Sequence, residues 1–366
     1  MSIKNLTCKS RIFPRIEEKT TKNEVKKNIN SDTSSSAVNK ATNKSHSLSL
    51  TFASLMIALV IILLAVRPER YAAACMEGIA VWLNFVLPSL FPFFILTALL
   101  TKLGRISKLS EKFSPITERV FGLPGISSYC FLISILSGYP VGSRMIADLK
   151  KSNLIDSKQA TEMSFLCSTS GPMFILGSVG TKMFSSKKIG LVLLLSHLTA
   201  VLIICFIRAL LRKKTPQSQK QLPALLKIDN ALYESVYGAV LSILTVGGFI
   251  ALFYVFAEIL TDLKILALPA LLFGKLFALF NMNNVAQAFT TGLIEVTRGC
   301  AMLAPFGASA LPLAAFLITF GGACILAQQL GYLKSAGVKA SAFLLIKVIQ
   351  AICAALLCIP VSALLL

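Results

Sequence analysis

Long stretches without a charged residue constrain this chain more than any other feature. They cover residues 47–66, 78–101, 120–143, 163–181, 189–207, 235–257, 276–294, 299–333 and 348–366. A helix needs roughly 20 apolar residues to cross a bilayer. Charged residues make up 14% of the chain, against about 25% in soluble domains. The sequence therefore predicts an all-α polytopic membrane protein surrounded by lipid, and excludes soluble enzyme folds.

The excess of positive charge is a topology signal rather than a binding face. The formal charge is +20, but much of it lies in residues 1–46 and in short segments between apolar runs. Nucleic-acid-binding proteins gather such charge on one compact face, so we expect no nucleic-acid partner. Residues 1–46 have too few apolar side chains to fold, which predicts a disordered basic cytoplasmic tail before a transmembrane helix at 47–66.

No residue pattern indicates a metal, a cofactor or an enzyme. The nine cysteines form no CxxC pair, and His46 and His197 are far apart in sequence. Such spacing matches no known metal-ligand pattern, and no nucleotide-binding or metalloprotease motif occurs. We interpret His197, alone in an apolar run, as a buried packing residue.

Two apolar runs are interrupted by helix-breaking residues. Run 120–143 contains Pro124 and Pro140 with several glycines, and run 163–181 contains Gly171-Pro172. Irregular backbone at membrane depth survives only inside protein or beside a wet cavity. If run 120–143 dips in and returns, the basic loops 102–119 and 208–227 and segment 144–158 share the cytoplasmic side. We therefore predict seven crossings plus two re-entrant segments.

The chain resembles itself at a fixed offset. Phe165–Gly171 aligns with Phe316–Gly322 at an offset of 151, and the same offset pairs Gly180 with Gly331. These matches predict two copies of one unit, at 70–214 and 224–366. In the re-entrant topology the copies are inverted, which is the plan of secondary transporters with a site at the repeat interface.

Four constellations are candidates for the substrate site. The first is a tip with free backbone N–H groups, hydroxyls and one arginine that suits carboxylates; it comprises Ser137, Gly138, Tyr139, Pro140, Ser143 and Arg144. The alternative is a GxxxG helix-packing motif, with the arginine at the interface.

The second constellation breaks a helix with hydroxyls, a glycine and a proline; it comprises Ser168, Thr169, Ser170, Gly171 and Pro172. Its alternative is hydroxyl groups that bond back to their own helix. The third, Glu295 and Arg298, places charges between apolar runs, where a functional site is the default interpretation; an interfacial ion pair is the alternative. The fourth, Thr319 with Gln328 and Gln329, could complete a polar cavity or bond two helices together.

Several strings resemble the YlbJ-type sporulation integral membrane proteins of the nucleoside-recognition (Gate) superfamily. They are Pro68-Glu69, WLNFVLPSLFPFF at 82–94, SGYPVG at 137–142 and CSTSGP at 167–172. The resemblance covers about residues 48–366, and the tail at 1–46 departs from it. It implies a role in endospore formation, with dipicolinic acid moved across the outer forespore membrane of a bacterial cell.

The sequence and the resemblance together predict a transporter rather than an enzyme. Dipicolinate at neutral pH is a flat dianion, so arginines and helix N-termini would suit it. We expect alternating access around a midplane site, and leave a coupling ion and a homo-oligomer open. The alternatives are another solute, such as a nucleoside or a metal ion, and a non-transporting sporulation scaffold.

Overall fold

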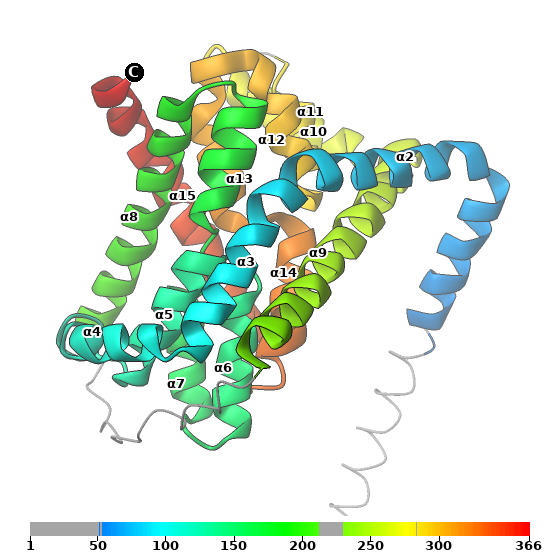
Figure 1. Ribbon diagram of the computed structural model, residues 1–366. Coiled ribbons are helices and arrows are strands. Elements are labelled where there is room, and N and C mark those ends of the chain that lie inside the picture. Colours follow the sequence, from blue (N-terminus) through cyan, green and yellow to red (C-terminus); the bar gives the residue numbers. More distant parts are fainter. Residues whose placement is uncertain (1–50, 52, 212–229, 283) are drawn as a thin grey trace, which may run out of the picture. The chain divides into compact units, whose positions relative to one another are not determined.

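The computed structural model describes residues 51, 53–211, 230–282 and 284–366 (Figure 1), and every regular element among them is a helix. The chain divides into two compact units, Met1–Arg67 and Pro68–Leu366. In the first unit the predicted tail at 1–46 lies outside the described residues. Of the predicted helix at 47–66, the structure describes the short apolar helix Ala53–Val66.

The second unit consists of two halves, here called the first half and the second half. The elements of the first half are α2 (Pro68–Val81), the π-helix η1 (Trp82–Val86), α3 (Leu87–Lys102), α4 (Arg105–Phe121), α5 (Ile126–Ser137), α6 (Val141–Lys151), α7 (Ser157–Leu166), the π-helix η2 (Phe174–Met183) and α8 (Lys187–Leu211). Those of the second half are α9 (Ala231–Asp262), α10 (Ala267–Ala278), α11 (Ala286–Ile294), α12 (Val296–Leu303), the 3-10 helix η4 (Ala304–Ala310), α13 (Leu311–Phe320), α14 (Gly322–Leu333) and α15 (Ala340–Leu365).

Five helical segments of the described residues are long and apolar enough to cross a membrane. They are Pro68–Lys102, Lys187–Leu211, Ala231–Asp262, Val296–Leu333 and Ala340–Leu365. A sixth would be the pair Lys108–Phe121 and Ile126–Ser137, which is bent by 102°. The sequence predicts seven crossings, one of them at 47–66, a run that the structure describes only in part.

Two segments differ from the sequence prediction. Run 276–294 is not one helix, because α10 ends at Ala278 and α11 begins at Ala286. Asn281 and Asn284 between them adopt positive φ angles of 56° and 69°, which asparagine tolerates better than apolar residues do. Segment 102–119 was expected to be a basic loop, but most of it forms α4, since its charged and apolar residues alternate at helical spacing.

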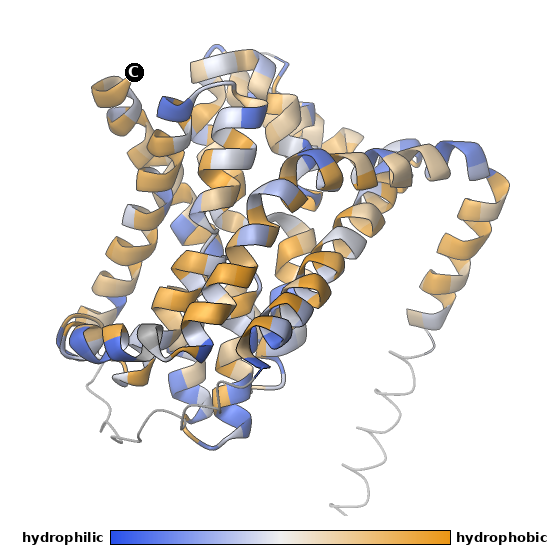
Figure 2. Cartoon of the chain, viewed as in Figure 1, coloured by the Kyte–Doolittle hydropathy of each residue, from blue (hydrophilic) through white to orange (hydrophobic). Residues whose placement is uncertain are grey.

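Hydrophobic residues predominate along the long helices, and hydrophilic residues gather at helix ends and in loops (Figure 2). On α8, for example, Leu195 and Phe206 are 41% and 43% exposed, and on α15 Leu356 is 63% exposed. Contiguous exposed apolar surface of this kind is unfavourable in water. It suits contact with lipid, as the apolar runs predict.

The two halves share one succession of elements. Each begins with a long apolar segment and a shorter helix, continues with short helices (four in the first half, five in the second, which also contains η4), and closes with a single long helix, α8 or α15. The short helices also contact each other crosswise, α6 against α14 and α12 against η2. The duplication of one unit and the inverted orientation of its two copies both stay predictions.

Candidate functional site

The first half is interrupted at the two predicted places. Helix α5 ends at Ser137 and α6 begins at Val141; α7 ends at Leu166 and η2 begins at Phe174. The two breaks touch each other, because Gly138 has a φ of 72° and a Cβ on it would overlap the backbone of Gly171. Only glycine combines that backbone conformation with so close an approach.

The second half repeats this arrangement with other side chains. Glu295 is extended between α11 and α12, and its carboxylate accepts a hydrogen bond from the backbone N–H of Arg298 at 2.7 Å. Between α13 and α14, Gly322 has a φ of 65°, and a Cβ on it would lie 2.9 Å from the carbonyl oxygen of Gly292. Again the glycine of the second break packs against the first break of its own half.

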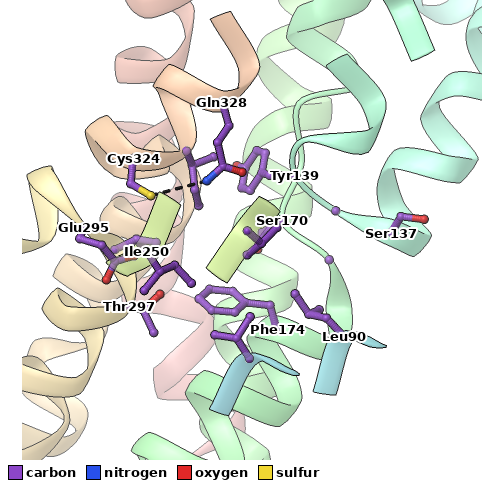
Figure 3. A pocket seen from close by; sticks show the side chains of 16 residues that line it. Leu90, Ser137, Tyr139, Ser170, Phe174, Ile250, Glu295, Thr297, Cys324 and Gln328 are labelled. Carbon is purple, nitrogen blue, oxygen red and sulfur yellow. Dashed lines mark hydrogen bonds between the residues drawn. The ribbon is translucent and has the colours of Figure 1, made fainter. Parts of the chain in front are cut away.

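A small cavity of about 50 Å³ lies where these breaks meet. Its walls come from both halves: Val86, Leu90, Ser137, Gly138, Tyr139, Ser170, Gly171, Phe174, Val246, Ile250, Glu295, Val296, Thr297, Cys324, Ile325 and Gln328. Figure 3 shows Glu295 and Thr297 on one side of it, and Ser137 and Ser170 on the other. Its lining is mostly apolar with a few polar groups, as is usual for small-molecule sites.

The charge of the lining is unlike the one predicted. Its residues include one carboxylate, that of Glu295, which is 1% exposed, and neither a lysine nor an arginine. The carboxylate of Glu295 already accepts a hydrogen bond from the backbone N–H of Arg298, because it caps the N-terminus of α12. The other helices that begin at the breaks, α6, η2 and α14, have no side-chain cap. Their N-termini therefore leave partial positive charge near the cavity.

The two predicted arginines lie outside the cavity. Arg144 is exposed and borders a separate hollow beside Asp148 and Tyr332. The guanidinium of Arg298 lies 3.3 Å from Glu258 and 3.5 Å from Glu77. Arg298 therefore holds α12 to α9 and α2 through ion pairs rather than facing a solute.

A network of buried polar groups lies behind the second break. The backbone N–H of Ser170 donates to Nε2 of His197 at 3.0 Å, and Nδ1 of the same ring is 2.9 Å from the hydroxyl of Thr319. Thr169 is 2.9 Å from the hydroxyl of Ser134. His197, expected to be a packing residue, thus joins the second breaks of the two halves through Ser170 and Thr319.

Gln329 and Lys347 extend this network. Oε1 of Gln329 accepts hydrogen bonds from the hydroxyls of Ser168 and Ser143, the latter at 3.2 Å. The ammonium of Lys347 donates to the hydroxyl of Tyr139 and to the carbonyl oxygen of Ser168, both at 3.0 Å. Lys347 is fully buried, so a cation lies one side chain behind the cavity wall.

The structure thus divides the predicted site residues into two groups. Those that line the cavity are Ser137, Gly138, Tyr139, Ser170, Gly171 and Glu295. Those that do not are Pro140, Ser143, Arg144, Ser168, Thr169, Pro172, Arg298 and Thr319. Several of the second group support the first through the network, and the binding role of every one of them stays a prediction.

Sequence reasoning missed Lys347. It is the only charged residue between Lys339 and the last residue, Leu366, and charged groups within a membrane helix mark functional sites by default. Lys347 directly precedes the apolar run at 348–366. Among the described residues, no group of three or more His, Cys, Asp or Glu side chains is placed to hold a metal ion.

Comparison with known proteins agrees with the resemblance found in the sequence. Residues 84–187 match the Gate family, described as nucleoside recognition, and this range contains both breaks of the first half. The chain is 26% identical over 313 residues to the sporulation integral membrane protein YlbJ of Bacillus subtilis (strain 168), covering 79% of this chain and 77% of that protein. No solved structure matches the chain. With its apolar helices, these matches identify the chain as an integral membrane protein.

Proposed function

We propose that this protein is a secondary transporter of endospore formation that moves a small organic anion, dipicolinate, across the outer forespore membrane. The route is alternating access around the cavity between the two halves. The sporulation role rests on the similarity to YlbJ, whose name places it in sporulation and in a membrane. The chemistry rests on the site, and a transporter accounts for it better than an enzyme does.

The observation that carries this proposal is the cavity at the junction of four helix breaks, two from each half. Interrupted helices that meet at an interface between repeats are how secondary transporters build their substrate sites. The uncapped N-termini of α6, η2 and α14 favour an anionic solute. Rocking of one half against the other would open the cavity to either side of the membrane.

One observation favours a second candidate, an uncharged solute such as a nucleoside. The lining contains the carboxylate of Glu295 and no lysine or arginine, and a buried carboxylate repels a dianion. The polar groups of Thr297 and Gln328 offer hydrogen bonds that a neutral solute can use. Uptake of dipicolinate in competition with uridine separates the two candidates.

Uptake of labelled dipicolinate into proteoliposomes of the purified protein tests the proposal, with uridine and empty vesicles alongside. Val246→Phe narrows the cavity, and Leu244→Phe changes a 53% exposed residue on the same helix. We expect saturable uptake in the wild type and in Leu244→Phe, and little in Val246→Phe. Uptake of uridine alone would change the solute. No uptake of either by folded protein would favour a non-transporting scaffold.

A further inference from the structure

We infer that Lys347 and Gln329 form a carboxylate-binding subsite behind Tyr139, and that this subsite supplies the positive charge that the cavity lining lacks. The inference deepens the proposed function and rests on it, because it names the group that selects an anionic solute. Neither residue lines the cavity in this structure. Both lie directly behind its wall.

Lys347 is a buried cation without an acidic partner. Its side chain is 0% exposed, its two hydrogen bonds go to uncharged oxygens, and no carboxylate of the described residues lies within ion-pair distance. A lysine ammonium carries three N–H donors, so one of them has no acceptor there. Burying a charge without a counter-charge is costly. An anionic ligand would supply the counter-charge that Lys347 lacks.

Gln329 points to the same ligand independently. It is fully buried, and both of its hydrogen bonds use Oε1, which accepts from Ser168 and Ser143. Its Nε2 has no hydrogen-bond partner among the described residues. Buried polar atoms nearly always have a hydrogen-bond partner. Because an amide N–H₂ group only donates hydrogen bonds, the missing partner of Gln329 must be an acceptor.

Lys347 and Gln329 both contact Ser168. Lys347 donates to the carbonyl oxygen of Ser168, and the hydroxyl of Ser168 donates to Gln329. One side of the second break therefore carries an ammonium and an amide, both with hydrogen atoms to spare. A carboxylate, with two acceptor oxygens and a negative charge, is the chemical class that satisfies both.

Tyr139 separates this subsite from the cavity. Its ring lines the cavity, the ammonium of Lys347 lies 5.0 Å from the ring centroid, and its hydroxyl takes one hydrogen bond from that ammonium. A solute carboxylate would take the place of the hydroxyl when the α5–α6 tip moves. Glu295 approaches the cavity from another wall (Figure 3) and would repel the anion toward Lys347.

Direct binding to the purified full-length protein tests the subsite, with dipicolinate, picolinate and the dimethyl ester of dipicolinate as probes. We expect Lys347→Met to weaken dipicolinate binding about 30-fold or more and to leave the uncharged ester unchanged. Lys339→Met, an exposed lysine at the start of the same helix, is the matched control and should bind as the wild type does. The melting temperature of Lys347→Met without ligand should not fall, because a buried unpaired charge is removed.

Gln329→Glu is a second variant that keeps the acceptor for Ser168 and Ser143. Its carboxylate would occupy Lys347 from within the protein, so dipicolinate binding should again fall about 30-fold or more while the protein still folds. This variant decides the question if Lys347→Met fails to fold.

The outcomes separate the subsite from the proposed function. Dipicolinate binding to the wild type that survives in both variants would overturn the subsite and leave the transporter standing. If the wild type binds no carboxylate, the subsite and the anionic solute both fail, and uridine uptake alone decides whether the protein transports. If Lys347→Met weakens the binding of dipicolinate and of its dimethyl ester equally, the role of Lys347 is structural and the subsite fails.

Discussion

The two halves of the molecule share an order of helices and breaks and differ in the side chains at those breaks. In each half the glycine of the second break, Gly171 or Gly322, packs against the backbone of the first break. At the first break itself, one half presents the hydroxyl of Tyr139 and the other the carboxylate of Glu295.

This difference separates what forms the site from what selects its ligand. The glycines fix the close approach of the breaks, and any half that lost them would lose the cavity. The side chains at the tips are free to differ, since the backbone does not depend on them. If the halves are copies of one unit, as the sequence predicts, the unit has kept its breaks while the side chains that bind and cap differ between the copies.

The largest effect is expected from alanine at one positive-φ glycine of each half, which tests whether both halves depend equally on their close backbone contacts. Gly138→Ala and Gly322→Ala each force a side chain into a left-handed backbone at about 1–2 kcal/mol and into contact with backbone at about 1–3 kcal/mol. Each should lower the free energy of unfolding in detergent by about 3 kcal/mol. Gly331→Ala has open space around it and should be neutral or stabilising. Tolerance of one of the two changes would break the equivalence.

A smaller effect is expected from Tyr139→Phe, which removes the hydroxyl that joins the halves. Lys347 would keep only the carbonyl oxygen of Ser168 as an acceptor. Losing a hydrogen bond to a buried charge costs about 1.5–3 kcal/mol, measurable as a lower melting temperature. Tyr129→Phe removes a hydroxyl that has no hydrogen bond among the described residues and should cost less than about 0.5 kcal/mol. Equal costs would show that the hydroxyl does not hold Lys347.

The next smaller effect is expected at Glu295, where two variants separate the stabilising effect of the helix cap from that of the negative charge. Glu295→Ala removes the cap of α12 and should destabilise the protein by about 1 kcal/mol. Glu295→Gln keeps an oxygen that can accept from Arg298, so chemical unfolding should show a smaller loss. Anion uptake by Glu295→Gln should rise, because the repelling charge is gone. A loss as large as that of alanine would mean that the charge, and not the cap, stabilises the break.

The smallest effects are expected at the arginines that the sequence favoured as ligands. Arg144→Ala changes an exposed side chain and should shift stability by less than about 0.5 kcal/mol. Arg298→Ala breaks partly exposed ion pairs worth about 1 kcal/mol or less. Both should keep dipicolinate uptake within about twofold of the wild type, since neither lines the cavity. Loss of uptake in Arg144→Ala would indicate that Arg144 binds the solute, and that the site lies nearer the separate hollow that Arg144 borders.

Much of the fold was predictable because its signals are local. Uncharged runs locate the long helices, and Gly138, Pro140 and Gly171-Pro172 locate the breaks, since backbone preferences act within a few residues. The predicted repeat placed a site between the halves, and the cavity is lined by both breaks of the first half and by Glu295 of the second. These are consequences of composition and spacing alone.

The partners of the charged residues could not be predicted. Arg298 donates a hydrogen bond to Glu258, 40 positions away in sequence, and Lys347 donates one to Tyr139, 208 positions away. Such pairings depend on how helices pack, which no local pattern encodes. The same limit explains α4, where a basic segment looked like a loop because its apolar face is visible only at helical spacing.

The length of α9 has a consequence for the membrane itself. Its uncharged stretch at 235–257 rises about 34 Å as a helix, whereas the hydrocarbon layer is about 30 Å thick. A stretch longer than the layer is accommodated by tilt, by a kink or by local thickening of the bilayer. Val246 and Ile250 lie on it and form part of the cavity wall. A thicker bilayer would reduce the tilt of α9 and move that wall. The length of the lipid chains would therefore affect the shape of the cavity.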